Sequence, residues 1–228
     1  MLDFTGTVAT AALIVFVING LLVFMEAPRG ARLVLAALLG LWLGLAAAAG
    51  AAGWLATARP FPIMGIFVAT PLVAASLATA WPAARHAMLS LPLRLMIGLN
   101  IGRVFAVLFL LLAAEGRLSG PFPYSAAWGD IITGVVALPL LWLARAEDRH
   151  TTALHLWNAF GMADLVAAIG LGVTSAAGSP LQLFHSGSGS EAMQHLPWSF
   201  VPTVLVPLWM ILHAIIWVRL RRPAKSAV

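Results

Sequence analysis

Seven long apolar runs constrain the fold of this chain more than any other feature of its sequence. The runs lie near residues 5–24, 33–56, 62–81, 95–114, 124–144, 154–175 and 198–218. Each has about 20 residues, the length that an α-helix needs to cross a hydrocarbon core of about 30 Å. Because the runs are continuous, without a period of two, they do not resemble the strands of a membrane barrel. We therefore predict an all-α polytopic membrane bundle, a single domain over residues 1–228 with seven transmembrane helices.

The composition supports a location in the lipid bilayer. Hydrophobic residues make up 61% of the chain and charged residues 9%, whereas roughly 25% of the residues in a soluble domain are charged. The net charge of +5 comes from short basic clusters between the apolar runs, so we predict no nucleic-acid partner. The first run lacks the basic segment that precedes a secretory signal, and we expect it to be retained as a span.

Basic residues are unequally divided between the two sets of loops. Ten fall on one side, namely Arg29, Arg32, Arg85, Arg94, Arg145, Arg149, Arg219, Arg221, Arg222 and Lys225. Only Arg59 and Arg117 fall on the other side. Since Lys and Arg are retained on the cytoplasmic side, we predict an external N-terminus, an external Gly/Ser-rich loop at 176–197 and a basic cytoplasmic tail at 219–228. Tryptophans lie near the predicted span ends, as in aromatic belts, at Trp54, Trp81, Trp128, Trp142, Trp157, Trp198 and Trp217.

Small residues in two of the runs predict close helix packing. G-x-x-x-G motifs occur at Gly40/Gly44 and at Gly98/Gly102. Such motifs let helix backbones approach one another in lipid. We expect packing within the chain, and a homodimer or a larger membrane complex is the alternative.

One arginine lies inside the fourth run, in LNIGRVFAVLFLLLAA at residues 99–114. A guanidinium near the bilayer centre costs roughly 3 kcal/mol, so Arg103 requires partners. Asp164, in the sixth run, is predicted at nearly the same depth, and Asp130, in the fifth run, nearer the outer surface. The planar guanidinium has five N–H donors and can bridge carboxylates from two helices. We predict that Arg103 pairs with Asp130, Asp164 or both, and that two acids beside one base share a proton.

The same polar residues also have a purely structural interpretation. A buried ion pair can serve only to fix which helices meet. A second polar cluster, Asn19, Asn100, Asn158 and His213, is predicted in the cytoplasmic third of the bundle. Hydrogen bonds between such amides are ordinary packing contacts. His213 has a further interpretation, because an imidazole can carry a proton or bind a metal.

Several classes of function are excluded by residues that the chain lacks. It has no cysteine, and hence neither a thiolate metal site nor a catalytic thiol. Its only lysine, Lys225, lies in the tail, so it lacks the Schiff-base lysine of retinal proteins. P-loop, H-E-x-x-H and G-x-S-x-G motifs are also missing from the sequence. His185, Glu191 and His195 are interrupted by Gly and Ser residues typical of a flexible linker. We therefore expect no metal and no cofactor, and the sequence assigns no catalytic residue.

Four segments between residues 103 and 213 carry the polar positions. They are RVF at Arg103, PFPYSAAWGD ending at Asp130, WNAFGMAD with Asn158 and Asp164, and LPWSFVPT followed later by His213. Together they resemble a group of uncharacterised bacterial seven-span membrane proteins with no assigned activity, over roughly residues 95–220. The resemblance implies a multi-pass protein of the bacterial inner membrane and suggests that these polar residues belong together.

These observations lead to one expected function and two alternatives. We expect Arg103, Asp130 and Asp164 to form an intramembrane polar site for the proton-linked transport or sensing of a small solute. One alternative is an intramembrane enzyme or redox protein that acts on a lipid-soluble substrate through His213. The other is an accessory subunit of a membrane complex.

Overall fold

The computed structural model describes residues 1–56, 60–144 and 152–221, and every regular element in these ranges is helical. The α-helices are α1 (Leu2–Phe24), α2 (Arg29–Ala51), α3 (Pro60–Ala78), α4 (Pro82–Ser90), α5 (Leu93–Leu99), α6 (Val107–Ala114), α7 (Phe122–Leu143), α8 (Thr152–Ser175) and α9 (Val206–Leu220). Shorter helical turns are η1 (Trp54–Ala56), η2 (Asn100–Ala106), η3 (Glu191–Gln194) and η4 (Val201–Leu205).

Six helices in the described ranges are long and apolar enough to cross a membrane. They are α1, α2, the joined α5–η2–α6 (Leu93–Ala114), α7, α8 and the joined η4–α9 (Val201–Leu220). The third predicted run corresponds to α3, which is followed by α4 at a bend of 110°. A seventh span is reached only if this bent pair is counted as one. The second predicted run is also divided, because α2 ends at Ala51 and Gly53 then turns the chain with a left-handed φ of +71°.

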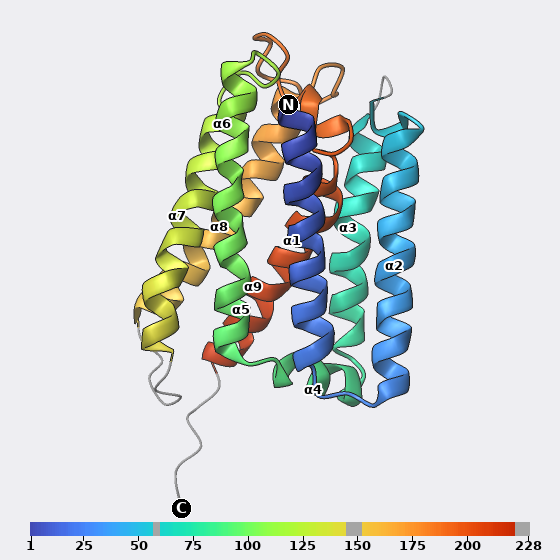
Figure 1. Cartoon of the computed structure of the whole chain (residues 1–228), viewed down its shortest axis with the longest axis vertical. Coiled ribbons are helices and arrows are strands. Elements are labelled where there is room, and N and C mark those ends of the chain that lie inside the picture. Colours follow the sequence, from blue (N-terminus) through green and yellow to red (C-terminus); the bar gives the residue numbers. More distant parts are fainter. Residues whose placement is uncertain (57–59, 145–151, 222–228) are drawn as a thin grey trace, which may run out of the picture.

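The helices form two groups with α9 between them. Helices α1, α2 and α3 lie side by side in one group, and α6, α7 and α8 make up the other (Figure 1). Helix α9 crosses the bundle obliquely and contacts α3, α5 and α8. It therefore joins the two halves of the molecule along its interior.

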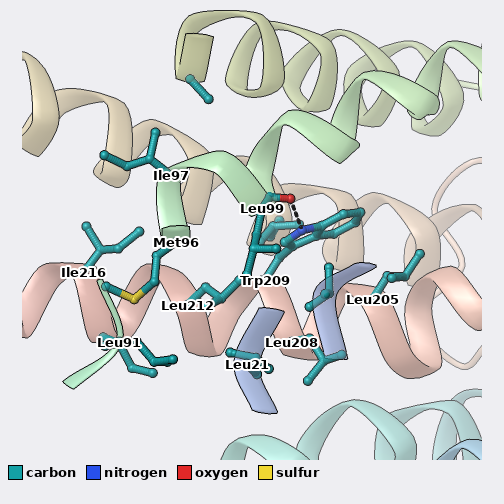
Figure 2. Close-up of a cluster of buried hydrophobic side chains, with 14 of the residues drawn as sticks. Leu21, Leu91, Met96, Ile97, Leu99, Leu205, Leu208, Trp209, Leu212 and Ile216 are labelled. Carbon is teal, nitrogen blue, oxygen red and sulfur yellow. Dashed lines mark hydrogen bonds between the residues drawn. The ribbon is translucent and has the colours of Figure 1, made fainter. Parts of the chain in front are cut away.

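An apolar core holds α9 against its neighbours. Figure 2 shows Leu21 of α1, Met96 of α5 and Leu212 of α9 among the side chains of this core. The indole Nε1 of Trp209 donates a hydrogen bond to the Leu99 carbonyl across 3.4 Å. In lipid, such contacts stabilise through van der Waals packing rather than through release of water. They fix α9 beside the stretch of chain that carries the buried arginine.

Two spans contain helical turns that depart from α geometry. Residues Asn100–Ala106 form a 3₁₀ turn in the middle of the fourth predicted span, and Val201–Leu205 form a π turn before α9. Pro202 lies within the π turn and cannot donate a backbone hydrogen bond. Such turns inside long helices commonly mark hinges or functional positions. The hydrophobic pattern alone did not predict either of them.

The Gly/Ser-rich segment at 176–197 is docked on the end of the bundle. Ser188 Oγ donates to the Gly116 carbonyl across 2.9 Å, and Ser190 Oγ donates to the Gly172 carbonyl across 2.6 Å. The Gly189 amide donates to Ser119 Oγ across 2.7 Å. The serines of this segment thus bind the carbonyls of Gly116 and Gly172, and the flexible linker suggested by composition stays a prediction.

Two tryptophans that the sequence placed at membrane interfaces are buried. Trp157 donates from Nε1 to the Thr133 carbonyl across 2.9 Å, and Trp198 donates from Nε1 to Asp3 Oδ1 across 2.8 Å. Only 5% of Trp157 and 1% of Trp198 are exposed. These two indoles stabilise helix contacts instead of anchoring the surface.

The two G-x-x-x-G motifs lie in different surroundings. A Cβ at Gly102 would lie 2.5 Å from a methyl of Leu13, so the motif Gly98/Gly102 packs within the chain. A Cβ at Gly40 or Gly44 would meet no described atom within 4 Å. The expected packing within the chain is thus wrong for the α2 motif.

The helix ends that carry basic residues gather at one end of the bundle. These are the start of α2, the whole of α4, the start of α5 and the end of α9, at the bottom of Figure 1. The basic residues Arg59, Arg145, Arg149, Arg222 and Lys225 lie outside the described residues, as does most of the predicted tail at 219–228.

Candidate functional site

Arg103 lies at the centre of a buried polar cluster. It belongs to the 3₁₀ turn η2, and 1% of the residue is exposed. Its Nε donates to Asp130 Oδ1 of α7 across 2.5 Å, and its Nη2 donates to Asp164 Oδ2 of α8 across 2.6 Å. Each carboxylate therefore binds a different nitrogen of the guanidinium. One arginine joins three spans through charge-assisted hydrogen bonds, which are stronger than neutral ones.

The remaining side of the guanidinium faces α8 and α9. Nη1 of Arg103 donates to the Gly161 carbonyl across 3.2 Å and lies 3.0 Å from Nε2 of His213. A guanidinium has only donors, so Nε2 of His213 accepts this bond. Three helices, α7, α8 and α9, thus contribute groups to the coordination of Arg103.

The bond from Arg103 fixes the tautomer of His213. Because Nε2 accepts, the proton of the neutral ring is on Nδ1, which donates to Asn158 Oδ1 across 2.8 Å. The Asn158 amide donates in turn to the His213 carbonyl across 3.1 Å. His213 is fully buried. We call Arg103, Asp130, Asp164, Asn158 and His213 the Arg103 cluster.

Aromatic rings enclose the cluster on the α9 side. The guanidinium carbon of Arg103 lies 5.8 Å from the centroid of the Trp209 ring, a distance at which an aromatic face attracts a cation. The ring of Trp157 lies 5.4 Å from that of His213. These rings lower the local dielectric constant on this side of the cluster, so its charges interact strongly.

Two glycines provide the space that the cluster occupies. A Cβ at Gly161 would lie 2.5 Å from Cε1 of His213, and a Cβ at Gly129 would lie 1.7 Å from Oδ1 of Asp164. Any larger residue at either position would collide with a member of the cluster. Glycine is required here for close approach.

Asp130 also lines a cavity. This cavity has a volume of about 280 Å³ and lies between α3, α7, α8 and η4. We call it the Asp130 cavity, and its walls include Val68, Phe109, Phe122, Leu165 and Val201. A smaller cavity of about 30 Å³ adjoins both Arg103 and Asp130, which is space for one water molecule. The carboxylate of Asp130 is therefore the part of the cluster that a ligand in the larger cavity would meet.

A family described as a domain of unknown function (DUF8737) matches residues 60–221. The chain belongs to this family. No curated protein and no solved structure matches the sequence. The DUF8737 region contains every residue of the Arg103 cluster and every described residue that lines the Asp130 cavity, whereas α1 and α2 precede it. The resemblance to an uncharacterised family, seen in the polar segments, is thus confirmed.

Only two of the four residues in the second predicted polar cluster lie together in the structure. Asn158 and His213 bond to each other and join Arg103, Asp130 and Asp164. Asn19 is exposed and donates to the carbonyl of Val15 in its own helix across 2.8 Å. Asn100 is buried and likewise donates to a carbonyl of its own helix, that of Met96. These two asparagines belong to their own helices and do not extend the cluster.

Several members of the site had no signal in the sequence. The Gly161 carbonyl accepts from Arg103 although it belongs to a regular helix, α8. Trp209 contacts the guanidinium from a run of apolar residues. The glycines near the two aspartates, Gly129, Gly134 and Gly161, were the sequence signal that these helices approach closely. Among the described residues, no group of three or more His, Cys, Asp or Glu side chains is placed to hold a metal.

Proposed function

We propose that this protein uses the Arg103 cluster for the proton-linked transport or sensing of a small solute in the bacterial inner membrane. The observation that carries the proposal is a single buried guanidinium between two carboxylates, one of which lines a cavity. We further propose seven spans, with the bent α3–α4 pair as one of them, an external N-terminus and a cytoplasmic C-terminus. The gathering of basic helix ends at one end of the bundle supports this orientation.

The charges of the cluster favour proton exchange. Arg103 contributes one positive charge, and Asp130 and Asp164 would contribute two negative charges if both were ionised. His213 accepts a hydrogen bond from the guanidinium and is therefore neutral. An uncompensated charge is costly in a low-dielectric interior. A proton on one carboxylate removes that cost, and so does a cationic ligand.

The arrangement of cavities supports passage of the solute through the protein. A second cavity of about 420 Å³ lies between α3, α4, α8 and α9, and we call it the Arg85 cavity because Arg85 lines it. One face of α3 lines the Asp130 cavity with Met64, Gly65, Val68, Ala69 and Leu72, and the Arg85 cavity with Leu72, Ala75, Ser76 and Thr79. Leu72 belongs to the walls of both cavities, so the two cavities adjoin each other at this residue.

The geometry favours this function over an enzyme centred on His213. The imidazole is fully buried, and its two ring nitrogens bond to Arg103 and Asn158. A general acid or base must reach its substrate within hydrogen-bond distance. His213 thus holds Arg103 in place, and Asp130 is the group that meets a ligand. Arg103 correspondingly holds the acids of the protein and no anionic group of a solute.

Infrared difference spectroscopy tests whether the cluster exchanges a proton. Films of the reconstituted protein are compared at acidic and alkaline pH, and we expect the C=O band of a buried, protonated carboxyl group. The band should be lost or shifted in Asp130→Asn and in Asp164→Asn. The variant Glu115→Gln is the control, because it removes an exposed carboxyl group and should leave that band unchanged. Absence of any pH-dependent band that either aspartate variant removes would overturn the proposed function.

A further inference from the structure

We propose that the solute of the Asp130 cavity is a small, lipid-soluble organic cation that takes the place of the proton at the Arg103 cluster. This inference rests on the proposed function and names the chemical class of its ligand. It follows from the walls of the cavity, the charge of Asp130, two aromatic rings and the cavity volume.

The walls of the cavity select against a hydrated ion. Among the described residues that line it, Asp130, Ser190 and Gln194 have polar side chains, and the others are apolar residues or glycine. A metal ion or a sugar would lose its water in this cavity without gaining enough polar partners. An apolar molecule would instead gain contacts with side chains such as Leu165 and Ile169.

The single ionisable group in the described wall is negative. Asp130 uses Oδ1 to bind Arg103, and 9% of its side chain is exposed. The guanidinium serves Asp130 and Asp164 together, so one carboxylate charge of the cluster remains to be compensated. A ligand with one positive charge would compensate it, whereas an anion would add to the excess.

Two aromatic rings line the Asp130 cavity. Phe109 and Phe122 both line it, and their ring centroids lie 6.5 Å apart. Aromatic faces bind quaternary ammonium groups through cation–π attraction, which strengthens when water is excluded. The combination of an acid and two phenyl rings favours an organic cation over a neutral hydrogen-bond donor.

The volume limits the size of the cation. Sites for drug-sized ligands have volumes of about 300–1,000 Å³, and the Asp130 cavity, with about 280 Å³, lies just below this range. The ligand is therefore a small molecule such as an ammonium group attached to one aromatic ring or to a short alkyl chain.

Exchange of this cation for a proton keeps the charge of the cluster constant. When the cation binds beside Asp130, the carboxyl proton leaves and the carboxylate pairs with the cation. When the cation leaves, the proton returns. No covalent bond other than the O–H bond forms or breaks, and the sum of charges in the site is the same in both states.

Benzyltrimethylammonium and neopentylbenzene provide a matched pair of probes. They have the same shape, but the first has a quaternary nitrogen where the second has a carbon, and neither can carry a titratable proton. We expect saturable binding of benzyltrimethylammonium to the detergent-solubilised protein, with release of about one proton per protein molecule. Binding should also remove the infrared band of the buried carboxyl group. Neopentylbenzene should neither release a proton nor remove this band.

Two glycines provide a matched pair of variants for the binding experiment. Gly65 lines the Asp130 cavity and Gly170 lies on an exposed part of α8, and a Cβ at either position would meet no described atom within 4 Å. Gly65→Leu should fill the cavity and weaken binding of the cation by roughly tenfold or more. Gly170→Leu should bind like the natural protein. Asp130→Asn should bind weakly and release no proton.

The experiment separates failure of this inference from failure of the proposed function. If the carboxyl band responds to pH but benzyltrimethylammonium neither binds nor removes it, the inference is wrong and the proposed function stands. Equal binding of neopentylbenzene would also overturn the inference, because the cavity would then select shape without charge. If no carboxyl band responds to pH, the proposed function fails and the inference fails with it.

Discussion

Gly129 of α7 lies so close to Asp164 of α8 that a Cβ on the glycine would be 1.7 Å from Oδ1 of the aspartate. The carboxylate thus occupies the volume that any other side chain at residue 129 would fill. This contact lets Asp164 reach Arg103 while the neighbouring residue, Asp130, reaches the same guanidinium from α7. The two spans and the arginine are therefore fitted to one another at a single depth in the bundle.

Replacement of Gly129 should displace Asp164 from Arg103. We expect Gly129→Ala to destabilise the protein by about 1–3 kcal/mol, the usual cost of overpacking a core. The measurement is the midpoint of thermal unfolding in detergent, followed by tryptophan fluorescence. Gly170→Ala is the control, because a Cβ there meets no described atom within 4 Å. Equal midpoints for the two variants would contradict the close contact.

Removal of Arg103 alone should destabilise the protein more than removal of all three charged groups, those of Arg103, Asp130 and Asp164. Arg103→Met leaves two buried carboxylates without their partner, and loss of one partner of a buried pair costs roughly 3–5 kcal/mol. Adding Asp130→Asn and Asp164→Asn to the same protein removes both orphaned charges and should restore more than half of the lost stability. The same unfolding midpoints test this order. A triple variant that is less stable than Arg103→Met would show that the carboxylates have other partners.

The tautomer of His213 can be read directly by nitrogen NMR. In protein labelled at histidine we expect Nδ1 of His213 to be protonated and Nε2 to be unprotonated, since Nε2 accepts from Arg103. The variant His213→Gln assigns the signals among the six histidines. Asn158→Leu should shift the Nδ1 signal but keep the tautomer, because Arg103 still donates to Nε2. Asn100→Leu should change neither, because Asn100 donates to its own helix. A protonated Nε2 would rule out the bond with Arg103.

Leu72 should control passage between the two cavities. Leu72→Ala should join the Asp130 cavity to the Arg85 cavity and raise the flux of benzyltrimethylammonium into proteoliposomes several-fold, whereas Leu72→Trp should reduce it. Leu77→Ala is the matched control on the same helix, because Leu77 is 61% exposed and lines neither cavity. Fluxes that are the same in all three variants would show that the solute does not pass Leu72.

The sequence left open which of two acids pairs with Arg103, and the packing of the helices decides it. The cost of a lone guanidinium in an apolar run predicted that acids from the following helices would approach it. Depth alone could not decide between Asp130 and Asp164. In the structure both acids bind Arg103, each through a different nitrogen of the guanidinium, because Gly129 lets α7 and α8 come close.

The asparagines show that the predicted depth of a residue in the membrane does not identify the members of the cluster. Asn19 and Asn158 fall at similar predicted depths, but only Asn158 joins the cluster. A depth along the membrane normal says nothing about the direction in which a side chain leaves its helix. In a bundle of mostly apolar helices the periodicity of polar residues is too weak to fix that direction.

The sequence by itself determined that the chain is an α-helical membrane protein, where most of its apolar helices lie, and that Arg103 needs acidic partners. These properties follow from the length of apolar runs and from the cost of a charge in lipid, which are local quantities. Only the tertiary structure decided that His213 and the Gly161 carbonyl complete the cluster, that α3 bends sharply into α4, and that Asp130 borders a cavity. Those features depend on how helices rotate and pack against one another, which contacts between distant residues determine.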